Sequence, residues 1–284
     1  MYEIQIACVI VLYKNALTEA KAIQSLIDCC TEQTGLAKQL SVLIYDNSPS
    51  AHEVPLIDIP FGVMEYHHDA QNGGLAKAYN YALEGALGRN TEWLLILDQD
   101  TVVTASLFTA LAREIAVPPP ANVIAIVPKL AQNGMVISPQ IVGQLRNDSV
   151  SARWAGISEK HLTALNSAAC LRVSAVVGIG GFPQEYWLDY LDHIMFHRLQ
   201  AVGGRLMVLD ITLQHRLSLL NLEDEMTIER YINMLASEWR FIRETSSAGG
   251  SLVHRLRLLK RAFTLYTELN TPGYALKTLR AVID

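Results

Sequence analysis

The sequence of 284 residues is 50% hydrophobic and 18% charged, which is enough apolar material for one large domain or two smaller ones with a sizeable core. No apolar run approaches the ~18 residues of a membrane span, and the amino terminus shows no basic region or cleavage site of a signal peptide. The net charge of −5 argues against a general nucleic-acid-binding protein.

Apolar, β-branched runs alternate with amphipathic stretches in the amino-terminal half. We predict strands at 4–13, 40–45, 63–66, 93–97 and 123–127. The predicted helices run from Asn15 or Thr18 to about Cys30, from 75 to about 87 and from about 105 to 116. This β-α-β alternation predicts an α/β fold with a mostly parallel central sheet and helices on both faces.

The second half is less regular, and the weak periodicity of residues 131–165 does not predict which helices or strands they form. The elements predicted next are a strand at 168–177, a turn at 178–183, a helix at 187–202 and a strand at 205–209. The pattern is helical from 223 to the end, with a break at 246–250. We therefore expect a main domain at 1–220 and a C-terminal helical extension at 221–284.

The strand at 93–97 runs straight into two carboxylates, Asp98 and Asp100. They lie where open α/β sheets bind ligands, just past the carboxyl end of a buried strand. Two carboxylates one residue apart point the same way on an extended backbone. Their repulsion favours a bound divalent cation, Mg²⁺ or Mn²⁺, shared with a substrate phosphate. The alternative is a solvated turn that starts the next helix at Thr101 or Thr104.

Two further polar segments follow predicted strands. Asp46-Asn47-Ser48 follows the second strand, and Asn72-Gly73-Gly74 follows the third and opens a helix. Glycines let the backbone approach a ligand closely, and a helix amino terminus favours anionic groups. Each segment alone is also a good turn or loop. Their recurrence after consecutive strands favours a nucleotide diphosphate bound together with a metal ion.

These segments belong to an ordered series of motifs. In chain order they are Val9-Ile10-Val11-Leu12-Tyr13-Lys14-Asn15, Ile44-Tyr45-Asp46-Asn47-Ser48, Asn72-Gly73-Gly74-Leu75-Ala76-Lys77-Ala78-Tyr79-Asn80, Leu97-Asp98-Gln99-Asp100, Gly180-Gly181-Phe182 leading to Asp189-Tyr190-Leu191-Asp192 with Arg198, and His215. The series, over roughly 4–217, resembles the family 2 nucleotide-sugar glycosyltransferases with the GT-A fold, closest to their bacterial rhamnosyltransferase branch. The resemblance implies a GT-A domain at 1–220.

The resemblance also implies the roles of the donor-site residues. The base and ribose would be held by Leu12, Tyr13 and Asp46. The diphosphate would be approached by the loop residues Asn72, Gly73, Gly74 and Lys77. Asp98 would contact the ribose or the metal, and Asp100 and His215 would bind the metal. Without the resemblance, His215 would be interpreted as an ordinary surface or core histidine.

The same resemblance implies inversion, in which Asp192 is the general base that deprotonates the acceptor hydroxyl. The family usually has a second acidic residue two places after the base, where this sequence has Ile194, so Asp189 is the rival candidate. A glycine common in the family after a serine is here Ala168, which follows Ser167. Both acids also fit an exposed helix amino terminus, where they favour the helix dipole.

The predicted reaction transfers a sugar, L-rhamnose from dTDP-L-rhamnose in the branch that is resembled, to a saccharide or lipid-linked saccharide in cell-surface polysaccharide synthesis. A UDP-sugar is the other donor considered. Two alternatives remain at this stage. In a haloacid-dehalogenase-type phosphatase, Asp98 would be the nucleophile and Asp100 a general acid. A nucleotide-sugar-binding module with the same fold would lack catalysis.

Cysteines and the C-terminal segment bear on location. The four cysteines, Cys8, Cys29, Cys30 and Cys170, form no Cys-x-x-Cys pair, which predicts a reduced, cytoplasmic protein without a zinc site.

On a helix over 251–263 the apolar residues share one face and the basic residues lie largely elsewhere. The apolar residues are Leu252, Leu256, Leu259 and Phe263, and the basic residues are Arg255, Arg257, Lys260 and Arg261. This pattern predicts peripheral contact with an anionic membrane. The alternative is packing on the body or on a second subunit, as in a homodimer.

Overall fold

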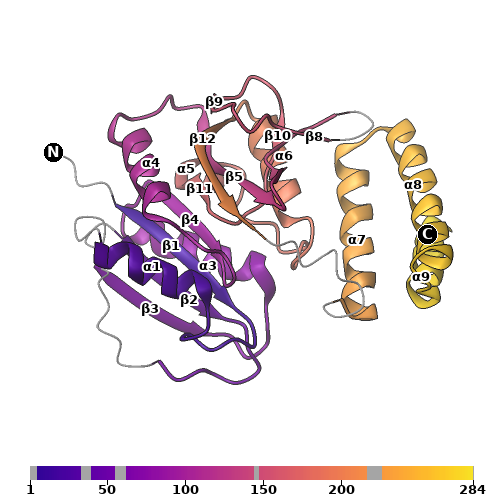
Figure 1. The fold of residues 1–284 in the computed structure, drawn as a ribbon, viewed down its shortest axis with the longest axis horizontal. Coiled ribbons are helices and arrows are strands. Elements are labelled where there is room, and N and C mark those ends of the chain that lie inside the picture. The colour runs from indigo at the N-terminus through magenta and orange to yellow at the C-terminus, as the bar shows by residue number, and fades with distance from the viewer. Residues whose placement is uncertain (1–4, 33–39, 55–61, 144–146, 216–225, 284) are drawn as a thin grey trace. The chain divides into compact units, whose positions relative to one another are not determined.

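The computed structural model describes residues 5–32, 40–54, 62–143, 147–215 and 226–283. The chain divides into two compact units (Figure 1). Unit 1 comprises Met1–Trp187 and Leu191–His215, and unit 2 comprises Leu188–Tyr190 and Arg216–Asp284. The domain boundary expected at residue 220 lies outside the described residues.

Unit 1 is built on one large sheet, which within the described residues has nine strands in the order β3-β2-β1-β4-β11-β5-β12-β9, with β6 paired to β5. The strands are β1 (Ile6–Leu12), β2 (Leu40–Asp46), β3 (Val63–His68), β4 (Trp93–Asp98), β5 (Val123–Gln132), β6 (Met135–Ser138), β9 (Gly156–Ile157), β11 (Ala169–Arg172) and β12 (Arg205–Gln214). Neighbours among β3, β2, β1 and β4 are parallel, as are β5 and β12. The short β11 is antiparallel to both β4 and β5. The predicted mostly parallel α/β architecture is confirmed.

Helices cover both faces of this sheet (Figure 1). They are α1 (Lys21–Glu32), α3 (Gly74–Gly88), α4 (Ala105–Ala116), α5 (Val173–Gly178) and α6 (Leu191–Ala201). All seven residues of β1 are buried, because alternate side chains of a covered strand pack against different layers. Cys8, Ile10 and Leu12 join one core with residues of α1 and α4. The buried residues of α6 include Leu191, Ile194, Met195 and Leu199.

Several predicted elements in unit 1 have different bounds. Helix α1 begins at Lys21 rather than Asn15 or Thr18, because residues 16–20 form a turn. The strand predicted at 168–177 ends at Arg172, where the chain turns into α5. Its valines suggested a strand because β-branched side chains favour sheets, but Val173 and Val176 are buried on a short helix. Helix α6 begins at Leu191 instead of 187.

The region that the sequence left unordered supplies β6 and β9 to the large sheet, and its other strands belong to a second, small antiparallel sheet. The small sheet contains β10 (Leu162–Thr163), β7 (Gln140–Ile141) and β8 (Asp148–Ser149), in that order. Strands of two residues carry too little periodicity to be recognised in a sequence. The side chain of His193 on α6 contacts this sheet, because its Nδ1 lies 2.6 Å from the hydroxyl of Thr163.

Unit 2 is helical, with α7 (Ile228–Thr245), α8 (Ala248–Thr267) and α9 (Pro272–Ile283). Its core includes Tyr231, Leu235, Trp239 and Leu258. The predicted break at 246–250 is present at 246–247, but a second break at 268–271 was not predicted. None of the helices in the described ranges combines the length and apolar character that crossing a membrane requires.

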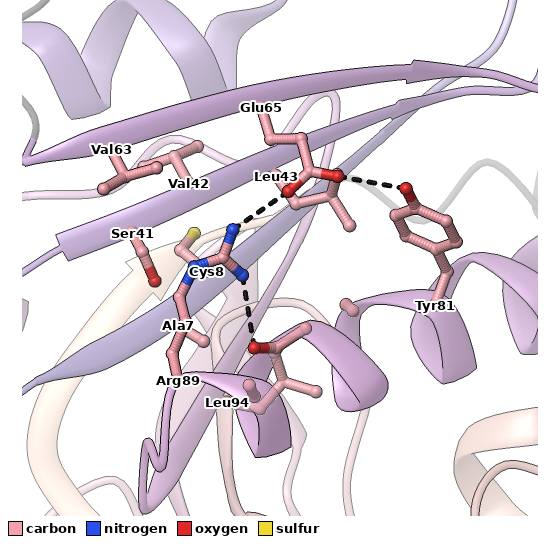
Figure 2. A pocket seen from close by; sticks show the side chains of 13 residues that line it. Ala7, Cys8, Ser41, Val42, Leu43, Val63, Glu65, Tyr81, Arg89 and Leu94 are labelled. Atoms are coloured by element: carbon pink, nitrogen blue, oxygen red, sulfur yellow. Dashed lines mark hydrogen bonds and ion pairs between the residues drawn. The ribbon is translucent and has the colours of Figure 1, made fainter.

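A pocket lies between α3 and the first halves of β1, β2 and β3, away from the strand ends that carry the predicted site (Figure 2). The polar groups in it satisfy one another. The Glu65 carboxylate accepts hydrogen bonds from Tyr81 at 3.0 Å and from Arg89 at 3.0 Å. These contacts join α3 to β3, so we assign the pocket a structural role.

Candidate active site

The carboxyl ends of β1, β2 and β4 meet at one edge of the sheet. In the register of the strands, Leu12 is paired with Asp46, and Val11 is paired with Asp98. Leu12 itself is fully buried, and its backbone carbonyl accepts from the N–H of Asn47 at 2.9 Å, which joins the end of β1 to the loop after β2. Tyr13 is 43% exposed, and its backbone N–H donates to Oε1 of Gln99 at 2.9 Å. The expected donor-site segments therefore share one edge.

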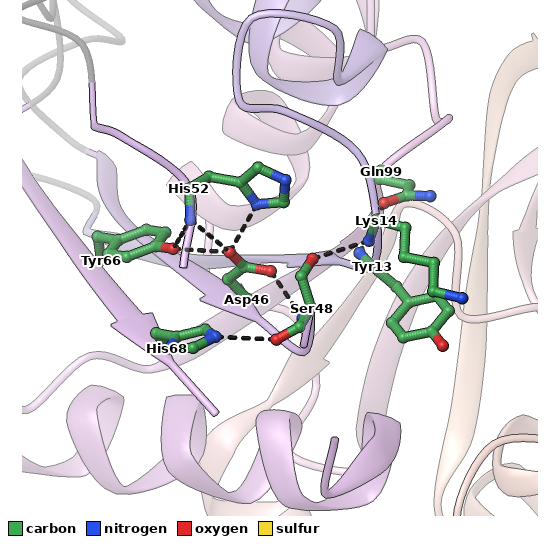
Figure 3. Close-up of polar contacts among 8 residues, drawn as sticks. All are labelled: Tyr13, Lys14, Asp46, Ser48, His52, Tyr66, His68 and Gln99. Atoms are coloured by element: carbon green, nitrogen blue, oxygen red, sulfur yellow. Dashed lines mark hydrogen bonds and ion pairs between the residues drawn. The ribbon is translucent and has the colours of Figure 1, made fainter. Parts of the chain in front are cut away.

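The Asp46 carboxylate is fully buried in a polar cluster (Figure 3). Its Oδ1 accepts from the backbone N–H of Ser48 at 2.9 Å, while its Oδ2 lies 2.7 Å from His52 Nδ1 and 2.6 Å from the Tyr66 hydroxyl. Burial alone would raise the pKa of Asp46, but these hydrogen bonds hold it below its ordinary value. Asp46 is thus an ionised acceptor whose partners position the loop after β2.

The loop before α3 is organised by Asp69, which the sequence analysis did not single out. Its carboxylate accepts from Lys77 Nζ at 2.7 Å, from the Tyr45 hydroxyl at 3.0 Å and from the backbone N–H groups of Gln71 and Gly73 at 3.2 and 3.1 Å. Burial would raise the pKa of Asp69, but these donors outweigh it and lower the pKa to about 2. Lys77, predicted near the diphosphate, is therefore ion-paired, with a side chain still 48% exposed.

The low pKa of Asp69 makes a pH-dependent prediction. A carboxyl with a folded-state pKa of about 2 instead of 3.8 contributes roughly 2 kcal/mol of stability above pH ~4, which is lost as the pH falls through ~2. Asp69→Asn should therefore lower the free energy of unfolding by about that amount at pH 7. In urea unfolding the difference from the parent should shrink between pH 4 and pH 2. A difference that stays constant over this range would contradict the assignment.

The Asn72-Gly73-Gly74 loop is clamped by Trp187. The indole Nε1 donates to the carbonyl of Asn72 at 3.0 Å, and the Trp187 carbonyl accepts from the backbone N–H of Leu75 at 2.8 Å. Gly74 has φ +81°, and a Cβ there would lie 2.4 Å from the Trp187 carbonyl oxygen. Only glycine fits, so the loop before α3 is held against the segment that leads to α6.

Gly74→Ala is accordingly expected to disrupt the loop. The left-handed conformation should cost about 1–2 kcal/mol and the clash about 1–3 kcal/mol more. Gly134→Ala is the matched control, because Gly134 has φ +77° with nothing within 4 Å of an added Cβ. Denaturant unfolding and nucleotide titration would compare the variants. If both lose the same stability and neither loses nucleotide affinity, Trp187 does not constrain the loop.

Asp98 interacts with several of the predicted site residues. It ends β4, and Ser167 donates a hydrogen bond to its Oδ2. Burial raises the pKa of Asp98, as do the charges of Asp100 and Asp192, while Ser167 and His215 lower it. Burial and then the charges of Asp98 and Asp192 raise the pKa of the Tyr79 hydroxyl well above its ordinary value. The fold thus brings three predicted site residues within electrostatic reach of Asp98: Asp100, Asp192 and His215.

Among the described residues, no group of three or more His, Cys, Asp or Glu side chains is already arranged around a metal position. The donor chemistry nevertheless suits a hard divalent cation. Burial and then the charges of Asp100 and Asp192 disfavour Asp98 as an anion, and Asp100 is exposed beyond it. His215 follows β12, and its backbone N–H donates to the carbonyl of Ala131 at 2.9 Å. A cation would offset the accumulated negative charge.

The two candidate bases have different surroundings. Asp192 lies in the first turn of α6, and its Oδ1 accepts from the backbone N–H of His193 at 2.7 Å. Asp189 precedes the helix, although the predicted helix at 187–202 would have included it. The cause is Tyr190, whose φ of +66° interrupts the helix. Asp189 is 9% exposed, with its carboxylate 3.9 Å from the Arg230 guanidinium in unit 2.

Three non-glycine residues in the segments that carry the candidate site have a left-handed, strained backbone. Lys14, Ala168 and Tyr190 have φ values of +54°, +61° and +66°. In the described chain the other non-glycine residues with positive φ are asparagines, which tolerate this conformation. Lys14 follows β1, Ala168 follows the Asp98 partner Ser167, and Tyr190 precedes α6. Such outliers gather at functional sites, and the value at Ala168 explains why glycine suits that position.

Four positioning residues were missed by sequence reasoning: His52, Tyr66, Asp69 and Ser167. Asp69, three residues before the Asn-Gly-Gly loop, carried a local signal, since Asp commonly bonds backbone N–H groups of its own turn. The contacts of Tyr66 and Ser167 join residues 20 and 69 positions apart, so only the folded sheet reveals them.

The sequence matches the family model for glycosyl transferase family 2 over residues 8–169. A search of curated proteins gives no significant match. Among solved structures, S. aureus TarS 1–349 in complex with UDP-GlcNAc aligns with a TM-score of 0.56 at 14% identity, covering 99% of this chain and 81% of that one. Another S. aureus TarS structure aligns at 0.52 and 12% identity over 98% of this chain, which spans about half (54%) of its length.

GalNAc-T7 with UDP, GalNAc and Mn²⁺ also aligns, with a TM-score of 0.52 at 12% identity, covering 75% of this chain and 43% of that one. At these identities the likeness establishes the fold, and the expected GT-A fold is confirmed. The phosphatase interpretation of Asp98 loses its basis, since the matched region includes Asp46, the Asn72 loop and Asp98 together. The family match covers more than half of the sequence, and the chain belongs to glycosyl transferase family 2.

Proposed function

We propose that the chain is an inverting glycosyltransferase that uses a nucleotide-sugar donor. The observation that carries this proposal is the row of polar segments after β2, β3 and β4 in a family 2 domain, with Asp98 in electrostatic contact with Asp192. Two structures of the same fold are described with UDP-GlcNAc and with UDP, GalNAc and Mn²⁺. They support a nucleotide-sugar donor here.

In this proposal the donor is held at the edge formed by β1, β2 and β4. At the end of β1, Tyr13, supported by the buried Leu12, would bound the base and ribose, and Asp46 would position the loop after β2 that contacts them. Asn72, Gly73 and Gly74 approach the diphosphate with their backbone, next to the cation of Lys77. Asp98 contacts the ribose or the metal.

Mg²⁺ or Mn²⁺ would be held by Asp98, Asp100 and His215 together with donor oxygens. When bound, the ion would stabilise the negative charge of the leaving diphosphate. This metal dependence is supported by the carboxylate donor set.

Asp192 is proposed as the general base. As the acceptor hydroxyl oxygen attacks the anomeric carbon, its proton passes to the Asp192 carboxylate, and the bond from that carbon to the diphosphate oxygen breaks. Attack opposite to the leaving group inverts the configuration. Asp189, ion-paired with Arg230, is the rival base.

A thermal-shift panel of nucleotides with and without Mn²⁺ tests the donor site. Stabilisation by UDP or dTDP that grows with Mn²⁺ supports the proposal. A response to fluoroberyllate without any response to nucleotides would instead favour phosphoryl transfer. Nucleotide binding without turnover of any sugar donor and acceptor would identify a binding module.

The preferred sugar is L-rhamnose from dTDP-L-rhamnose, supported by the motif resemblance alone. Release of free nucleoside diphosphate should be measured with dTDP-rhamnose, UDP-GlcNAc and UDP-glucose, with a mixture of saccharides and polyprenyl-linked saccharides as acceptors. Turnover of a UDP-sugar with none of dTDP-rhamnose would overturn the choice of donor while leaving the reaction class intact.

Domain roles and location complete the proposal. The GT-A domain at 1–220 would bind the donor, and the extension at 221–284 would contact the acceptor, a membrane surface or a second subunit in a homodimer. The four cysteines are all free and buried, which supports a reducing, cytoplasmic location.

A further inference from the structure

The C-terminal helices combine exposed apolar side chains with an excess of positive charge. Of the large hydrophobic residues exposed on the described chain, a dense group falls within 248–283: Leu252, Leu256, Leu259, Phe263, Tyr266, Leu269, Leu276, Leu279 and Ile283. Residues 248–283 contain six Lys or Arg and a single Glu, a net charge of +5 in a chain whose total is −5. A concentration of this kind marks an interaction surface.

Helix α8 has two apolar faces, and only one of them is used inside unit 2. The inner face packs in the core through Leu258 and Leu265, which are 0% and 3% exposed. The outer face is a row with alternating spacings of four and three residues, all 43–66% exposed: Leu252, Leu256, Leu259, Phe263 and Tyr266. We call these five residues the outer row.

The charges beside the outer row show which partner it fits. One exposed basic residue, Lys260, flanks the row, a second, Arg257, is exposed farther round the helix, and α8 contains no Asp or Glu. The other two basic residues are used within unit 2: Arg261 binds the buried Glu238 at 2.7 and 2.9 Å, and Arg255 lies 5.4 Å from the Trp239 ring. An apolar row on a helix whose exposed charges are all positive matches the interface of an anionic lipid bilayer.

A second copy of the helix would fit the row less well. Spacings of four and three also suit a coiled-coil seam, in which the residues beside the seam face the partner helix. Here those flanking positions include Arg255 and Lys260, and α8 offers no acidic residue to pair with them. Self-pairing would therefore place like charges opposite one another, whereas anionic lipid headgroups would neutralise them.

We propose that the outer row of α8, together with Arg257 and Lys260, docks the protein on an anionic membrane surface. The apolar side chains enter the boundary between headgroups and acyl chains, Lys260 contacts the headgroups beside the row, and the charge of Arg257 adds to the attraction of the anionic surface. This inference is independent of the transferase reaction, since it uses no residue of the candidate active site.

The test is sedimentation of the full chain with vesicles of phosphatidylcholine alone or with 30 mol% phosphatidylglycerol (about one lipid in three). Binding is expected with the anionic vesicles at low salt, weaker at high salt and weaker with phosphatidylcholine alone. Arg257→Gln/Lys260→Gln should weaken binding about 30-fold, at about 1 kcal/mol per cation. Leu256→Gln/Phe263→Gln should weaken it by about 10²-fold or more.

Matched controls separate docking from general effects of charge and folding. Arg153→Gln/Lys160→Gln removes the same charge from exposed positions in unit 1 and should leave binding unchanged, as should Val117→Gln/Val202→Gln at exposed apolar positions. Thermal unfolding of each variant checks the fold. No binding of the parent to anionic vesicles overturns the proposal. So does a parent dimer in light scattering that Leu256→Gln/Phe263→Gln turns into a monomer, because the row would then bind a second copy.

Discussion

Asp192→Asn is expected to slow sugar transfer by roughly 10²–10⁴-fold, the usual contribution of a positioned general base. The amide keeps the size of the side chain and can still accept from the backbone N–H of His193, as the carboxylate does at 2.7 Å. It cannot take a proton from the acceptor. Nucleotide and Mn²⁺ affinity should change little, so the loss should appear in kcat, measured with saturating donor.

Asp189→Asn is the matched control, three residues away. Its carboxylate is largely buried and lies 3.9 Å from Arg230, so the substitution should lower stability more than it lowers transfer. Full activity of Asp192→Asn with an inactive Asp189→Asn would move the base to Asp189. Loss of nucleotide binding in both variants would place this segment in the donor site and contradict the proposed mechanism.

The sheet at the centre of unit 1 was predictable because its strands are buried on both faces. Runs such as Val9-Ile10-Val11-Leu12 and Leu94-Leu95-Ile96-Leu97 have no polar face, and such runs are typical of parallel strands covered by helices. Their ends could be located because Asp46 and Asp98 interrupt the apolar runs. The site residues at those ends therefore followed from the order of the strands.

Elements that depend on distant contacts were not predictable. β11 inserts antiparallel between β4 and β5, which places Ser167 against Asp98, 69 positions away. No local sequence pattern around Ser167 predicts that it lies next to Asp98. The same holds for α6, because the left-handed Tyr190 stops a helical pattern that continues in the sequence on both sides.

Asp98 shows why part of the site opposes the stability of the fold. It is a carboxylate that neighbouring carboxylates and burial make unfavourable as an anion. A raised pKa in the folded state means that the folded chain binds a proton more tightly than the unfolded chain. The contribution of Asp98 to stability therefore falls as the pH rises through its folded-state pKa.

Asp98→Asn should consequently raise the melting temperature at pH 7–8 in the absence of metal, while its advantage over the parent shrinks on acidification. The Ser167 hydroxyl can still donate to the amide oxygen, so the hydrogen bond to β4 survives. Transfer should fall at least about 10²-fold, since a metal ligand that stabilises the leaving diphosphate supplies several kcal/mol. Differential scanning fluorimetry over pH, with and without Mn²⁺, and an assay of turnover measure both effects.

Asp100→Asn distinguishes the effect of removing a buried charge from the effect of removing a metal ligand. Asp100 is exposed, so its replacement should change the metal-free melting temperature much less than Asp98→Asn does, yet it should abolish metal-dependent turnover equally. Mn²⁺ should raise the melting temperature of the parent and of neither variant, because each lacks one of the paired carboxylates. If Asp98→Asn melts below the parent at pH 8 while Mn²⁺ still stabilises it, Asp98 is a structural group of β4 and the metal lies elsewhere.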